Sequence, residues 1–248
     1  MTLNEFFQKN PKAALAFSGG VDSAYLLYFA RQCGAEVQAY YVQSAFQPQF
    51  ERADAERLTV LLGATMRVLE VDVLSVPQVA ANPPDRCYHC KRAIFETIAK
   101  TAAADGYALV LDGTNASDDA GDRPGMRALQ ELTVRSPLQE CGLAKDEIRR
   151  LSKEAGLFTW DKPAYACLAT RIPAGEAITA EKLQKTEAAE DYLFSLGLTD
   201  FRVRLLDGCA RIQVPEAQLP QVLEKRREIL NTLRKTHSGV LLDLEARG

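Results

Sequence analysis

The chain has 248 residues, of which 47% are apolar and 25% charged, a composition typical of globular proteins rather than disordered, fibrous or disulfide-stapled ones. Its 30 basic and 33 acidic residues give a net charge of -3. That balance disfavours a nucleic-acid partner, because phosphate-backbone binding normally requires a strongly basic surface. The first residues hold no signal-peptide pattern and no stretch approaches a membrane helix, so we expect a cytoplasmic protein without a membrane partner.

Short apolar segments alternate with longer amphipathic ones over the first 111 residues. The predicted strands are 13–17, 37–42, 66–71 and 107–111, and the predicted helices between them are 21–33, 50–62 and 90–104. This alternation predicts an α/β fold with a Rossmann-like doubly wound parallel sheet. Glycines after the helical runs, at positions 34, 63 and 106, support the predicted helix ends.

The pattern changes in the second half of the chain. A polar stretch (112–125), a helix (145–155) and an irregular stretch (163–175) are followed by a helix (179–196), strands (201–206, 210–214), a helix (219–234) and a last strand (239–244). We therefore expect two domains. Residues 1–176 would bind a nucleotide, and residues 177–248 would form a smaller α+β domain that contributes to substrate or phosphate binding and to oligomerisation.

The most informative segment, Ser-Gly-Gly-Val-Asp-Ser at 18–23, lies between the first predicted strand and the first long helix. Adjacent Gly19 and Gly20 let backbone N–H groups approach an anion, and the helix N-terminus favours negative charge. Ser18 and Ser23 add hydroxyl donors, and Asp22 can orient a metal ion or cap the helix. The spacing matches neither a Walker A loop nor a dinucleotide fingerprint, and the alternative interpretation is a glycine-rich helix cap.

This motif resembles the pyrophosphate loop of the PP-loop ATP pyrophosphatases, which cleave ATP to AMP and pyrophosphate. The resemblance implies ATP with Mg²⁺ or Mn²⁺ as the cofactor. It also implies ATP contacts from Ser18, Gly19, Gly20, Asp22 and Ser23, from Ser44 after the second strand, and from Gly113 and Thr114 after the fourth.

Several longer motifs indicate a more specific family. They are Asn-Pro-Pro-Asp-Arg-Cys-Tyr-His-Cys-Lys (82–91), Asp-Gly-Thr-Asn (112–115), Arg-Pro-Gly (123–125), Pro-Ala-Tyr-Ala-Cys-Leu-Ala-Thr-Arg-Ile-Pro (163–173), Phe-Arg-Val-Arg (201–204) and Ala-Arg-Ile (210–212). With them the chain resembles the LarE family of ATP-dependent sulfur transferases, which act in nickel-pincer (lactate racemase) cofactor synthesis. The resemblance implies a small nucleotide substrate, pyridinium-3,5-dicarboxylate mononucleotide. A carboxylate of that substrate is adenylylated and then converted to a thiocarboxylate, and the family forms hexamers.

The six cysteines divide into two groups. In LarE enzymes of the sacrificial kind the cysteine at the position of Cys167 gives up its own sulfur and becomes dehydroalanine. Alternatively Cys87, Cys90 and Cys167 hold a [4Fe-4S] cluster whose open iron binds a hydrosulfide, the variant that the cysteine spacing favours. A structural or disulfide role is the third interpretation. The remaining cysteines, at 33, 141 and 209, are expected to be structural.

The distal part supplies candidate substrate contacts. Arg202 and Arg204 alternate along a predicted strand and so share one face. The resemblance assigns this pair to phosphate binding, with Arg171 near Cys167 and Glu190 as a metal or substrate ligand; the alternative is that these side chains are simply solvated. Gln213 stands where the family commonly has glutamate, which weakens a distal metal site because an amide lacks the carboxylate charge.

Three other functions remain open from the sequence. A PP-loop tRNA thiolase shares the same ATP chemistry but calls for a basic RNA-binding face. An ammonia-using synthetase of the NAD or GMP synthetase kind leaves Cys87, Cys90 and Cys167 without a role. A nucleotide-binding regulatory module would bind ATP without releasing AMP.

Overall fold

The structure is a computed structural model that describes residues 1–118 and 124–247. It divides into two compact units, Met1–Val76 with Asp85–Lys162 and Pro77–Pro84 with Pro163–Gly248. The expected domain boundary at residue 176 falls inside the second unit. Arg123, which contributes to the family motif, lies outside the described residues. No helix in the described parts combines the length and apolar character needed to cross a bilayer.

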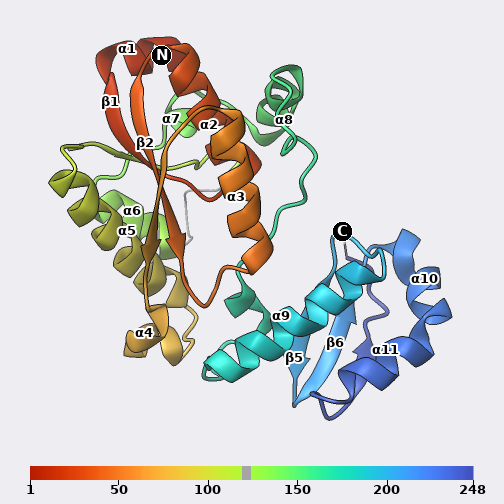
Figure 1. Cartoon of the computed structure of the whole chain (residues 1–248). Helices are drawn as coiled ribbons and strands as arrows, with labels where there is room; N and C mark the ends of the chain where they lie inside the picture. The colour runs from red at the N-terminus through yellow and green to blue at the C-terminus, as the bar shows by residue number, and fades with distance from the viewer. Residues whose placement is uncertain (119–123, 248) are drawn as a thin grey trace. The chain divides into compact units, whose positions relative to one another are not determined.

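The first unit is built on a four-stranded, all-parallel sheet (Figure 1). Its strand order is β3-β2-β1-β4. The strands are β1 (Lys12–Ala16), β2 (Glu36–Gln43), β3 (Met66–Glu70) and β4 (Val110–Leu111). Because β1 lies between β2 and β4, the chain changes direction across the sheet at β1, and ligands of such folds bind at this switch point. The predicted Rossmann-like class is confirmed.

Helices cover both faces of this sheet. They are α1 (Leu3–Lys9), α2 (Val21–Gln32), α3 (Gln49–Leu61), α5 (Arg86–Ala104), α6 (Pro124–Glu131), α7 (Pro137–Glu140) and α8 (Lys145–Glu154). Successive strand residues alternate between the faces. Leu15 and Tyr41 pack with α1, α2 and α8, whereas Ala14 and Tyr40 pack with α5 and α6.

The first unit differs from the sequence prediction in several elements, because the sequence analysis predicts none of the helices α1, α6 and α7. Helix α5 begins at Arg86 rather than at Cys90, so that both cysteines of the Cys-x-x-Cys motif lie in its first two turns. The end of the polar stretch 112–125 opens helix α6, whose apolar side, including Met126 and Leu129, packs on the sheet. Periodicity misses the start of α5 and the whole of α6, which follows a polar stretch rich in Gly and Asp.

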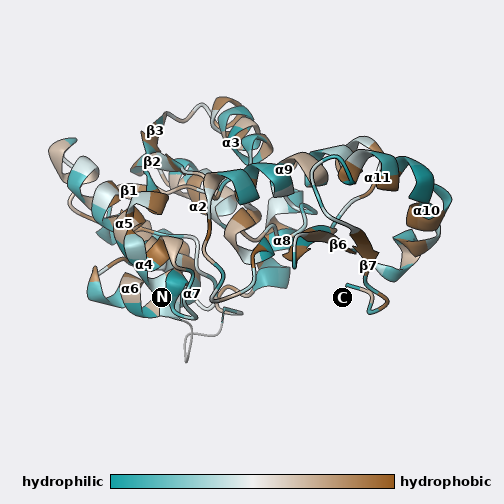
Figure 2. Cartoon of the chain, turned by 90° about the horizontal axis from the view of Figure 1, so that it is seen from below, coloured by the Kyte–Doolittle hydropathy of each residue, from teal (hydrophilic) through white to brown (hydrophobic). Residues whose placement is uncertain are grey.

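The second unit packs helices against a three-stranded sheet. Its elements are α4 (Pro77–Ala80), α9 (Ala180–Ser195), β5 (Arg202–Leu206), β6 (Cys209–Gln213), α10 (Leu219–Glu224), α11 (Arg226–Leu233) and β7 (Val240–Leu242). Strand β6 pairs antiparallel with β5 and parallel with β7. Figure 2 shows apolar colour on β6 and β7 and mixed colours on α9, α10 and α11. The single helix expected over 219–234 is two helices that meet at Lys225.

His237, at the end of the α11 region, makes the second unit sensitive to acid. The side chain is buried, and its Nδ1 lies 3.2 Å from the Leu233 carbonyl while its Nε2 has no hydrogen-bond partner in the described structure. Burial lowers the pKa of His237 below its ordinary value of 6.5. The unfolded chain therefore binds the proton first, so this residue should lower the free energy of unfolding as pH falls below about 6.5. Between pH 8 and pH 5, the melting temperature should fall less for His237→Gln than for the wild type. Equal decreases would contradict the prediction.

Candidate functional site

The predicted ATP-binding loop, residues Ser18–Ser23 (the ATP loop), connects β1 to α2. Its two serine hydroxyl oxygens lie 3.1 Å apart, and the Gly20 N–H donates to Ser18 Oγ at 3.4 Å. Ser23 Oγ also donates to the Gly20 carbonyl at 3.2 Å. Gly20 is the N-cap of α2 and no side chain caps the helix there. The first N–H groups of α2 therefore point from an uncapped helix end, which is the arrangement that binds phosphate.

Gly19 has a structural reason to be glycine. Its φ is +71°, and a Cβ at this position would lie 3.0 Å from the Cβ of Ala55 in α3. Both the left-handed backbone and the close approach of α3 exclude a side chain. The backbone conformation of Gly19 thus shapes the loop together with the hydrogen bonds of Ser18 and Ser23.

The turn after β4 packs directly on this loop. A Cβ on Gly113 would lie 3.0 Å from the Ser23 nitrogen, so only glycine permits the approach. The buried Asp112 carboxylate holds the turn, accepting from the Thr114 hydroxyl at 2.5 Å and the Ser136 hydroxyl at 2.6 Å. The structure therefore brings Gly113 and Thr114 to the predicted ATP loop, although the Thr114 hydroxyl is used within the turn.

Asp22 faces a cation that the sequence analysis missed. Lys145 Nζ, at the start of α8, lies 2.5 Å from Asp22 Oδ2, and the Asn115 amide donates to Oδ1 at 3.5 Å. Burial raises the pKa of Asp22, opposed by the Lys145 ammonium. A lysine 123 residues further along the chain has no local signal that links it to the loop. Lys145 thus places a positive charge beside Asp22 in the first turn of α2.

Ser44 lies in the turn after β2. Its hydroxyl donates to Gln47 Oε1 at 2.6 Å and accepts from the Phe46 N–H at 3.2 Å. The side chain thus closes the turn. Its predicted contact with adenine stays a prediction.

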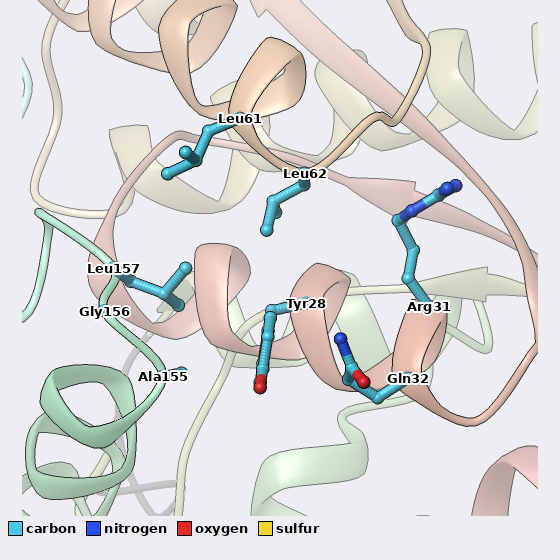
Figure 3. A pocket seen from close by; sticks show the side chains of 8 residues that line it. All are labelled: Tyr28, Arg31, Gln32, Leu61, Leu62, Ala155, Gly156 and Leu157. Atoms are coloured by element: carbon cyan, nitrogen blue, oxygen red, sulfur yellow. The ribbon is translucent and has the colours of Figure 1, made fainter.

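A pocket of about 390 Å³ lies elsewhere in the first unit, between the C-terminal ends of α2, α3 and α8. Figure 3 shows Tyr28, Leu61, Leu62 and Leu157 around it. The ATP loop is at the other end of α2, which at 1.5 Å per residue is about 18 Å long. This pocket contains none of the predicted site residues.

Cys87 and Cys90 are three residues apart at the start of α5 and therefore share one helix face. Cys87 is exposed and Cys90 is half-buried. The guanidinium of the buried Arg86 lies 3.5 Å from Cys87 Sγ. The Cys87 thiol thus lies at a helix N-terminus beside a positive side chain.

Cys167 belongs to the second unit, where it caps the short 3-10 helix Leu168–Arg171. Arg171 is fully buried and pairs with Glu190 of α9, Nε to Oε1 at 2.7 Å and Nη2 to Oε2 at 3.1 Å. Tyr165 also donates to Glu190 Oε2, and the Val203 N–H donates to Oε1 at 2.9 Å. Glu190 is therefore not the solvated residue of the alternative interpretation. Direct binding of metal or substrate by Glu190 would have to displace these donors.

Arg202 and Arg204 lie on the same face of β5, as predicted, and neither is simply solvated. Arg202 Nη2 donates to the Ala164 carbonyl at 2.5 Å and Arg204 Nη1 to the Thr170 carbonyl at 2.6 Å. Burial, with the charge of nearby Arg171, lowers the pKa of Arg202 to about 10, which leaves it protonated at neutral pH. The three arginines thus gather around the segment that carries Cys167, with Glu190 as the carboxylate bound to Arg171.

Comparisons with known proteins identify relatives of the chain. The chain is 36% identical over 214 residues to the pyridinium-3,5-bisthiocarboxylic acid mononucleotide synthase of Lactiplantibacillus plantarum, a match that covers 86% of this chain and 78% of that protein. The chain belongs to the LarE family. It is an ATP-dependent sulfurtransferase of the PP-loop kind. No known family model matches the chain.

Two further relatives of this LarE protein differ in how similar they are to it. An uncharacterized protein of Synechocystis is 38% identical over 224 residues, covering 90% of this chain and 83% of its own length. A tRNA-specific 2-thiouridylase of Thermotoga petrophila is 24% identical, covering 61% of this chain and 54% of its own length. The tRNA thiolases are therefore distant relatives, and the shared PP-loop chemistry implies ATP with a divalent metal ion.

The predicted iron-sulfur cluster has no support from this geometry. Among residues 1–118 and 124–247, no group of three His, Cys, Asp or Glu side chains is arranged to hold a metal ion. Cys87 and Cys90 belong to the first unit and Cys167 to the second. The three-cysteine variant and its cluster remain predictions.

Gly19→Ala tests the ATP loop. We expect the left-handed backbone to cost about 1–2 kcal/mol of stability. The contact with Ala55 should also distort the loop and weaken ATP binding about tenfold, as measured by calorimetry. Gly106→Ala is the matched control, because Gly106 has a φ of +84° but no atom within 4 Å of its added Cβ. ATP affinity that falls equally in both variants would contradict a specific role for the loop.

Proposed function

We propose that this LarE protein converts a carboxylate of pyridinium-3,5-dicarboxylate mononucleotide to a thiocarboxylate for nickel-pincer cofactor synthesis. The observation that carries the proposal is the 36% identity to a synthase of the corresponding bisthiocarboxylic acid mononucleotide over most of both chains. The N-terminus of α2, which no side chain caps, supports the proposal because the first half of the reaction needs a phosphate-binding site.

A carboxylate is a poor electrophile, so ATP first activates it. The carboxylate oxygen attacks the α-phosphorus, the substrate acyl-adenylate forms and pyrophosphate leaves. Ser18, Gly19, Gly20 and Ser23 would hold the departing pyrophosphate, and Lys145 would offset its charge. Mg²⁺ or Mn²⁺ supplies further neutralisation of phosphate oxygens.

Sulfur then replaces AMP on the activated carbon. In the sacrificial route the Cys167 thiolate attacks, AMP leaves, and a thioester joins substrate and protein. Removal of the Cys167 Cα proton breaks the Cβ–S bond, leaving thiocarboxylate on the substrate and dehydroalanine on the chain. Arg202 and Arg204, which lie beside this segment, would contact the substrate phosphate after releasing the backbone carbonyls that they now bind.

The cluster route makes Cys87, Cys90 and Cys167 ligands instead. The support for it is the donor set: three cysteines, two of them three residues apart at a helix N-terminus. When bound, the cluster would supply sulfide to the activated carboxylate. This route leaves Cys167 intact and allows repeated turnover.

One experiment tests both the function and the route. Protein purified without oxygen is analysed for iron and sulfide, then incubated with ATP, Mg²⁺ and the dicarboxylate mononucleotide. We expect AMP, pyrophosphate and a product in which sulfur replaces oxygen. Protein that loses the elements of H₂S at Cys167 indicates the sacrificial route, and iron-containing protein with intact Cys167 and several products per chain indicates the cluster. ATP-dependent sulfur transfer to tRNA but not to the mononucleotide would refute the proposed substrate.

The quaternary structure follows from the same family relation. We propose a homo-oligomer, a hexamer by resemblance to LarE proteins, that works in the cytoplasm. Sedimentation of the purified chain tests the assembly.

A further inference from the structure

The segment 164–176, which carries Cys167, has only one short helical turn. Backbone carbonyls in such a segment lack the hydrogen-bond partners that regular secondary structure supplies. Side chains of the same unit supply partners instead. The bonds run from Arg202 to Ala164 O, from Arg171 to Ala166 O, from the Thr170 hydroxyl to Cys167 O and from Arg204 to Thr170 O.

Asn82 continues this series on the C-terminal side of Cys167. Its Nδ2 donates to the Pro173 carbonyl at 2.8 Å and to the Glu176 carbonyl at 3.1 Å, and it lies 3.4 Å from the Ile172 carbonyl. The Asn82 carbonyl in turn accepts from the Gly175 N–H at 2.8 Å. The side chain is 1% exposed, so these contacts replace solvent.

The backbone of Asn82 is also unusual. Its φ is +55°, in the left-handed region where asparagine is among the few residues with a side chain that are commonly found. This backbone conformation points the buried side-chain amide at a cluster of carbonyl oxygens. Carbonyl oxygens accept hydrogen bonds, so the group that faces them must be a donor. Asparagine meets both requirements, and it lies 85 residues before Cys167 in the chain.

We propose that Asn82 is a positioning residue for Cys167. It fixes the end of the segment whose other end the arginines hold, so that the sulfur stays where the activated carboxylate meets it. Misplacement of a reacting group by about 1 Å can cost a hundredfold in rate. The inference rests on the proposed function only for the reaction that Cys167 performs, because the anchoring itself is independent of substrate.

Two variants separate the amide from the backbone. Asn82→Gly keeps the left-handed backbone and removes the side chain, whereas Asn82→Asp keeps shape and backbone preference but turns the donor into a carboxylate facing carbonyl oxygens. Asp207→Gly is the matched control, because Asp207 has a φ of +48° and an exposed side chain in the same unit. Melting curves for all three show how much of any effect is general destabilisation.

The first readout is iodoacetamide alkylation of Cys167 without substrate, followed by peptide mass spectrometry. We expect both Asn82 variants to raise the alkylation rate about three- to tenfold, as the loss of one or two hydrogen bonds allows, with Asp207→Gly unchanged. The second readout is sulfur transfer in a single turnover. Its rate constant should fall about tenfold while the ATP concentration for half-maximal rate stays the same, because the ATP loop belongs to the other unit.

Alkylation at the wild-type rate in Asn82→Asp and Asn82→Gly would overturn the proposal, whatever their melting temperatures. If Asn82→Gly does not fold, Asn82→Asp decides the question on its own. Absence of sulfur transfer in the wild-type protein would refute the proposed function but would leave the alkylation result as a test of the anchoring.

Discussion

Replacement of Cys167 by alanine is expected to reduce thiocarboxylate formation by at least about a thousandfold, as the loss of a reacting nucleophile typically does. Both proposed routes need this sulfur, either as the atom transferred or as a cluster ligand. Activation of the carboxylate does not need it. Pyrophosphate release in the first turnover should therefore continue, which separates the two half-reactions.

Cys209→Ala is the control for this experiment. Cys209 is a free, half-buried thiol in β6 of the same unit, 3.5 Å from the Ser238 hydroxyl. It should retain product formation and pyrophosphate release. Thiocarboxylate formation by Cys167→Ala at the rate of Cys209→Ala would contradict both routes, because each needs the Cys167 sulfur.

The second large effect concerns stability. Glu190→Ala should lower the free energy of unfolding by roughly 3–5 kcal/mol, the usual cost of removing one partner of a buried ion pair. Arg171 would stay buried with its charge uncompensated, and the Val203 N–H and the Tyr165 hydroxyl would lose their acceptor. Urea unfolding followed by circular dichroism measures the change.

Two comparisons make this result specific. Glu190→Gln keeps the shape and an acceptor oxygen, so it should lose less stability than Glu190→Ala. Glu181→Ala, on the same helix, breaks only an exposed pair with Lys185 and should leave the unfolding midpoint nearly unchanged. A Glu190→Ala midpoint close to that of Glu181→Ala would show that Arg171 finds another partner.

The sequence predicts those parts of the fold whose signals are local. Strands β1, β2 and β3 are short apolar segments followed by helices, and the observed bounds lie within one residue of the predicted ones. Strand β4 is shorter, at two residues, because residues before Val110 do not pair along β1 in the same register. The loop Ser18–Ser23 is recognisable because its conformation depends on its own glycines.

The contacts that complete the candidate site depend on residues far apart in the chain. Lys145 reaches Asp22 across 123 residues and Glu190 reaches Arg171 across 19, on elements whose packing no local pattern specifies. Asn82 shows the same limit: the motif around it is visible in the sequence, but its three carbonyl partners at 172–176 are not. Periodicity predicts which face of an element is buried, not which buried polar groups meet.

The early segment Pro77–Pro84 belongs to the later unit, so the chain passes between the units at three places, after Val76, after Pro84 and after Lys162. A recombinant C-terminal fragment starting at Pro163 would lack Asn82 and the Ala80 carbonyl that accepts from the Ile178 N–H. The N-terminal fragment would in turn contain Pro77–Pro84 without the rest of the unit to which this segment belongs. A chimaera that places the second unit, with Cys167, in another LarE protein must therefore exchange both segments, Pro77–Pro84 and the segment from Pro163 onward.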